Sequence, residues 1–134
     1  MKIYSKFSRI FLTFLISIFL LACSSDSKLS TESWCSDVRS QLEILGVGWP
    51  VAQKTLSLEQ AKRVEEVMRD MSDKAHDEDL LFASKVWVEK YNLIYPYIVG
   101  NDLEGFYYNV NKNDQEAMHL ANVSISNFCQ WESW

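Results

Sequence analysis

Several acidic residues and both histidines follow the chain order of a carboxylate-bridged di-metal site in a helical bundle. They are Glu43, Asp73, His76, Glu89, Glu116 and His119. In such a site every ligand points into the core at the same depth. At about 100° per residue, Asp73 and Glu89 fall on the opposite side from the apolar stripes of their helices. The pattern therefore predicts no metal, and we interpret each histidine as a surface residue.

No other spacing in the chain is typical of a catalytic or cofactor-binding motif. The run from Asn109 to Asn113 imitates the alternating ligands of a calcium loop, but Asp114 and Leu120 stand where that loop requires glycine and glutamate. HExxH, glycine-rich phosphate loops and GxSxG do not occur in the sequence. We expect no cofactor and a protein that binds rather than catalyses. The alternative is an enzyme whose polar cleft is not marked by any sequence motif.

The first of three cysteines, Cys23, closes a segment with the composition of an export signal. A basic start is followed by the apolar run from Ile10 to Leu21 and by small Ala22. The run has twelve residues, whereas a membrane-spanning helix needs about 20. The sequence therefore predicts export through a cleaved signal peptide, residues 1–22.

The four residues Leu20-Leu21-Ala22-Cys23 resemble the lipobox of bacterial lipoproteins. The resemblance implies a diacylglycerol on the Cys23 sulfur, cleavage after Ala22 and usually acylation of the new amino terminus. More than one acyl chain is needed for stable anchoring. Because Ser24 rather than aspartate follows the cysteine, the resemblance favours an outer-membrane anchor with the domain in the periplasm.

The other two cysteines, Cys35 and Cys129, form an even pair in an exported chain, which predicts a structural disulfide. They lie at opposite ends of the chain and form no CxxC motif, so a catalytic thiol pair is the weaker alternative. Removal of the signal leaves 112 residues with ten basic and eighteen acidic side chains, a formal charge of −8. This charge disfavours nucleic acid as a ligand.

The mature chain predicts an all-α fold, a small up-down-up-down four-helix bundle. We expect a Ser-rich lipidated tether over 23–33 and one helical domain over 34–134. Capping residues and apolar periodicity place helices at about 34–45, 57–76, 79–95 and 113–130. The last stripe combines Ala117, Leu120, Ala121, Ser124 and Phe128. Pro96 is expected to break or kink the third helix, and 97–112 is predicted to be a connection with a short helical turn or an extended piece.

In this bundle Cys35 and Cys129 lie at the same end, near the tether. The 46–55 loop and the 97–112 connection are then at the far end. A core of this size cannot easily bury all the aromatic residues. The residues expected to be partly exposed, as a partner surface or as plugs of the bundle ends, are Trp49, Phe106, Tyr107, Tyr108, Trp131 and Trp134.

These observations predict a membrane-anchored module that binds a protein. One version is an inhibitor or immunity-type lipoprotein that blocks an incoming toxin or phage factor. The second is an accessory subunit of an envelope assembly, held by its apolar third helix or by the aromatic clusters.

Overall fold

A computed structural model describes residues 27–49 and 55–132 of the 134-residue chain. Five helices form in this part, where four were predicted. They are α2 (Thr31–Ile44), α3 (Leu58–Ser72), α4 (Glu78–Gly100), α5 (Leu103–Asn109) and α6 (Lys112–Cys129). The fold is all-α as predicted, and the extra helix is the short α5 within the 97–112 connection.

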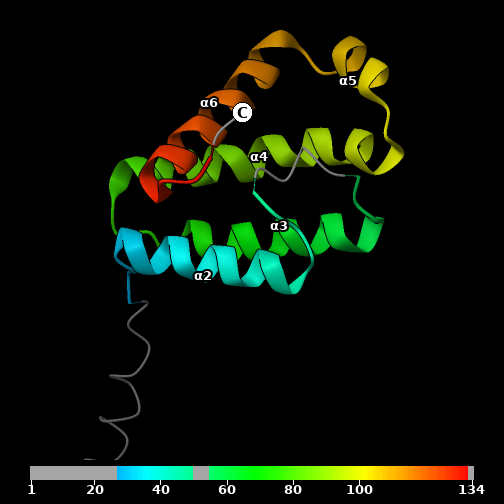
Figure 1. The fold of residues 1–134 in the computed structure, drawn as a ribbon. Coiled ribbons are helices and arrows are strands. Elements are labelled where there is room, and N and C mark those ends of the chain that lie inside the picture. The colour runs from blue at the N-terminus through cyan, green and yellow to red at the C-terminus, as the bar shows by residue number, and fades with distance from the viewer. Residues whose placement is uncertain (1–26, 50–54, 133–134) are drawn as a thin grey trace, which may run out of the picture.

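The long helices surround one apolar core (Figure 1). Helix α4 packs against both α3 and α6, and α2 closes the remaining side. Helix α3 buries Ala61, Val64, Met68 and Met71, and α4 buries Leu80, Ala83, Trp87, Tyr91 and Ile94, each set at spacings of three and four residues. A second apolar stripe of α4 is only partly covered, since Phe82 and Leu93 are exposed.

The predicted disulfide is present and joins the first turns of α2 to the end of α6. The Cα atoms of Cys35 and Cys129 lie 5.4 Å apart across 94 positions of sequence. Figure 1 shows the start of α2 and the end of α6 on the side of the bundle away from α5. The disulfide and α5 therefore mark opposite ends of the molecule.

Three boundaries differ from the prediction. Helix α3 ends at Ser72 rather than near residue 76. Helix α4 continues through Pro96 to Gly100 and ends at Asn101 in the left-handed conformation, φ 49°. Proline removes one backbone donor, but Ile98 and Val99 beyond it still pack against the core. Helix α2 begins at Thr31 rather than near residue 34, and Ser30 is its N-cap.

The segment before α2 is docked on the α3–α4 turn, although the sequence assigned it to the tether. The Leu29 backbone N–H donates to the Lys74 carbonyl at 2.7 Å, and its carbonyl accepts from His76 at 3.0 Å. The Lys28 ammonium donates to the Asp73 carbonyl at 2.5 Å. The half-buried Leu29 side chain packs against the core. The fold therefore begins only a few residues after Cys23.

Indole groups connect the helices through polar contacts inside the core. Trp34 donates to the Met71 carbonyl at 2.7 Å. Trp87 donates to the Asn122 side chain at 2.7 Å. Both rings are fully buried, and each N–H must find an acceptor because an unpaired buried donor is costly. The acceptors fix which faces of α3 and α6 turn toward the tryptophans.

Replacing Tyr91 by phenylalanine is expected to raise the free energy of unfolding by about 1 kcal/mol. Tyr91 is fully buried and stacks on Trp87 with ring centroids 4.5 Å apart. Its hydroxyl has no partner among the described residues, and burial raises its pKa. Urea unfolding of Tyr91→Phe measures the change, with exposed Tyr108→Phe as the neutral control. A destabilised Tyr91→Phe would show that the hydroxyl is hydrogen-bonded.

Candidate functional site

Helix α5 presents apolar side chains to solvent at the end of the bundle farthest from the disulfide. Leu103, Tyr107 and Tyr108 are 69%, 67% and 82% exposed, and no residue of α5 is buried. Phe106 is half-buried. Its ring packs edge-on against Tyr97 of α4, with centroids 6.2 Å apart. We call Leu103, Tyr107 and Tyr108 the α5 surface.

Local capping interactions fix the short α5 helix. Asp102 is its N-cap and accepts a hydrogen bond from the Gly105 N–H at 2.8 Å. A Cβ atom at position 105 would meet the Asp102 carboxylate, which would have to move from its present place. At the other end Asn109 donates to the Gly105 carbonyl at 2.9 Å. These bonds hold the helix in place although it has no buried residue.

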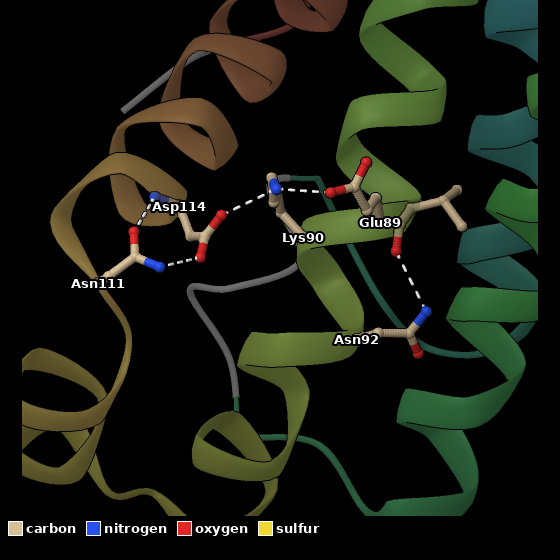
Figure 2. Close-up of polar contacts among 6 residues, drawn as sticks. Glu89, Lys90, Asn92, Asn111 and Asp114 are labelled. Carbon is tan, nitrogen blue, oxygen red and sulfur yellow. Dashed lines mark hydrogen bonds and ion pairs between the residues drawn. The ribbon is translucent and has the colours of Figure 1, made fainter.

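An ion pair ties the start of α6 to α4, just beyond α5 (Figure 2). The Lys90 ammonium lies 2.8 Å from Asp114 and 2.6 Å from Glu89. The side chain of Asn111, the N-cap of α6, accepts a hydrogen bond from the Asp114 backbone N–H at 2.9 Å and donates one to the Asp114 carboxylate. The side chains of Lys90 and Asp114 are only 17% and 20% exposed. Because α5 lies between these two anchored helices, the ion pair helps to position it.

Lowering the pH is expected to weaken this junction. The hydrogen bond from Lys90 lowers the pKa of Asp114, and the bond to Asp114 raises the pKa of Lys90. A lowered carboxyl pKa stabilises the fold above the ordinary pKa of about 4, and this contribution is lost as the pH falls through the lowered value.

Urea unfolding of wild type and Asp114→Asn at pH 7 and pH 2 tests this expectation. The two proteins should differ at pH 7 and converge at pH 2. The exposed residue Asp37 supplies the control, since Asp37→Asn should have little effect at either pH. A difference between wild type and Asp114→Asn that persists at pH 2 would contradict the ionic role.

Trp49 is half-buried against the end of α6 rather than at the far end of the bundle, and Trp131, expected to be partly exposed, is buried. After α2, Gly46 at φ 70° turns the chain back, and Val47 is buried. The half-buried Trp49 ring contacts Trp87 and Trp131, and its N–H donates to Ser126 at 2.8 Å. Trp131 is 9% exposed, with the Arg39 guanidinium 5.3 Å from its ring centroid. These two tryptophans plug the core, whereas Trp134 lies outside the described residues.

Two hollows occur elsewhere on the described surface. An open groove of about 790 Å³ runs between α2 and α3. Two arginines on its rim are already in ion pairs, Arg63 with Glu66 and Arg69 with Glu65. A smaller hollow of about 320 Å³ beside Trp49 and Trp131 is lined by Arg39, Glu43 and Glu132, among others. Neither hollow holds a buried acid, base or nucleophile.

The candidate metal ligands do not converge. Among residues 27–49 and 55–132, no three His, Cys, Asp or Glu side chains lie close enough to hold a metal ion. Asp73 instead pairs with Lys85 at 2.9 Å, and this contact lowers its pKa. None of the helices described is both long and apolar enough to cross a membrane. Searches of protein-family models, curated proteins and solved structures give no match to this chain.

Proposed function

We propose that this protein is a lipid-anchored module of the bacterial cell envelope that acts by binding another protein through the α5 surface. The observation that carries the proposal is the exposure of Leu103, Tyr107 and Tyr108 on a helix with no buried residue. Large aromatic side chains are favoured anchors of protein interfaces, because each buries a large area with few rotatable bonds. Exposure of these side chains contributes nothing to the stability of the domain itself, and a binding role would explain it.

The anchor belongs to the same proposal. The lipobox-like residues before Cys23 imply lipid attachment, and the fold starts at Leu29. Six residues of extended chain span about 20 Å at most. Lipidation at Cys23 would therefore keep the docked end of the domain close to the membrane. The Cys35–Cys129 bond suits the oxidising periplasm.

An inhibitor or immunity-type role suits this arrangement best. Such a protein needs a stable scaffold, a membrane address and one exposed binding face. An accessory subunit of an envelope assembly is the second candidate, because Phe82 and Leu93 expose a separate apolar stripe on α4. When the assembly is held by this stripe of α4 rather than by the aromatic clusters, the two candidates place the partner on different surfaces.

Substitution of the two surfaces tests the proposal. We expect Tyr107→Ser with Tyr108→Ser to abolish co-purification of a specific partner from solubilised envelopes, since both side chains are exposed and outside the core. Phe82→Ser is the matched control, because Phe82 is also an exposed aromatic residue, 70% accessible, on α4. Loss of the partner with Phe82→Ser alone would favour the assembly role and contradict binding at α5. Circular dichroism checks that each variant is folded.

A further inference from the structure

We infer that the partner of the α5 surface is a cationic protein that packs an apolar side chain against the exposed Tyr107 and Tyr108. This inference rests on the proposed function and adds the chemistry of the partner. The acidic residues next to the exposed apolar side chains support it. Nothing else in the fold covers the α5 surface among the described residues.

Helix α5 and its N-cap residue together have two carboxylates and no base. Asp102 and Glu104 are both exposed, and neither is in an ion pair within the described residues. Between Asn92 and Asn113 the one base is Lys112, at the first residue of α6. The nearest other cation, Lys90, is held by Glu89 and Asp114. An apolar surface with acidic residues at its edge complements a basic surface that has an apolar centre.

The net charge makes a second copy of this chain an unfavourable occupant. The described residues contain nine bases and seventeen acids, a formal charge of −8. Two such domains repel each other, and joining their α5 surfaces would bring Asp102 and Glu104 of each copy together. The same field attracts a basic protein and raises its rate of encounter.

Charge also disfavours the bilayer as the occupant. Anionic lipid surfaces attract clusters of Lys and Arg, and α5 has none. The docked Leu29 lies beside the α3–α4 turn, whereas α5 follows the other end of α4. The 23 residues of α4 separate the two by about 35 Å at 1.5 Å per residue. Tyr107 and Tyr108 are therefore presented away from the tethered end.

Selection of binding peptides tests the inference. The probe is a displayed library of random twelve-residue peptides, selected against the lipidated protein in nanodiscs. We expect the selected peptides to combine Lys or Arg with one aromatic or aliphatic residue. Their affinity should fall at least tenfold for Tyr107→Ser with Tyr108→Ser, and about fivefold in high salt.

Two matched charge reversals separate attraction of the peptides by the acids beside α5 from attraction by the net charge of the whole domain. Glu104 and Glu32 are both exposed acids in the first turn of a helix, α5 and α2 respectively. Glu104→Lys should weaken the selected peptides about fivefold, and Glu32→Lys should change their affinity less than twofold. Equal effects of the two reversals would overturn the inference.

The remaining outcomes distinguish the inference from the proposed function. Peptides that need the two tyrosines but ignore Glu104→Lys would leave the proposed function standing and refute a cationic partner. Peptides that bind equally well without the tyrosines would refute binding at α5 itself. Lipid vesicles are the last probe, and tyrosine-dependent binding to vesicles of phosphatidylethanolamine and phosphatidylglycerol would overturn the cationic protein in favour of a membrane contact.

Discussion

Replacing Cys35 and Cys129 by serine is expected to lower the free energy of unfolding by about 4 to 5 kcal/mol. The bond closes a loop across 94 positions of sequence, and in the chain-entropy model the stabilisation grows with loop length. It also holds the first turns of α2 to the last turn of α6, two helices that otherwise share a modest contact. Small domains have a total stability of about 5 to 15 kcal/mol, so the variant should be close to unfolded at 37 °C.

Urea unfolding followed by far-ultraviolet circular dichroism measures this effect. Reduced wild-type protein is the control that separates loss of the bond from the burial of serine hydroxyls, because Cys35 is 7% exposed. Both forms should be destabilised by a similar amount. A loss below 1 kcal/mol in both would show that packing alone holds the two ends of the bundle together.

Exchanging residues 1–23 for a cleavable signal without a lipobox is expected to move the protein from the membrane fraction to the soluble periplasmic fraction. None of the described helices could cross a membrane. The expected shift rests on the lipid that the lipobox resemblance implies at Cys23. Two or three acyl chains bind a bilayer firmly, whereas loss of all of them leaves nothing comparable. The expected shift is therefore nearly complete.

The soluble form also tests the assignment of the cysteines. It should fold, keep the Cys35–Cys129 bond and unfold at the same urea concentration as the anchored form. Mass spectrometry of the wild-type amino terminus should find Cys23 with acyl chains. Retention of the exchanged form in membranes, or an unmodified Cys23, would contradict lipid anchoring.

Apolar periodicity predicted α3 and the main face of α4 because the core there consists of aliphatic, aromatic and methionine side chains. The same reasoning failed on α6. Leu120, predicted to be buried, is 56% exposed, whereas Asn122 and Ser126 are buried. These two polar residues accept hydrogen bonds from Trp87 and Trp49. The buried face also carries Met118, Ala121 and Ile125 at helical spacing. Helix α6 therefore has two apolar stripes, and the hydrogen bonds to the tryptophans select the one without Leu120.

Contacts distant in sequence explain the other differences. Pro96 has a strong local preference to end a helix, but Ile98 and Val99 are held by the core of the finished fold. Leu29 lies in a Ser-rich segment, and its docking depends on free backbone groups of Lys74 and His76. Neither segment contains a local sequence signal that predicts these distant contacts.

The candidate site was predictable in part. Tyr107 and Tyr108 were expected to be partly exposed, and they are. Trp49 was also expected to be partly exposed, and it is half-buried, with its ring against Trp87 and Trp131. The Lys90–Asp114 pair was missed, although acids and amides at the start of a helix are a signal for capping.

Site-specific photo-crosslinking in intact cells tests the central claim most directly. A photoreactive amino acid replaces Tyr107 in one strain and Phe82 in another, since both positions are exposed aromatic residues on different helices. Binding through α5 predicts one discrete protein adduct from position 107 and none of the same mass from position 82. The absence of any adduct at 107, or the same adducts from both positions, would contradict the proposed binding surface.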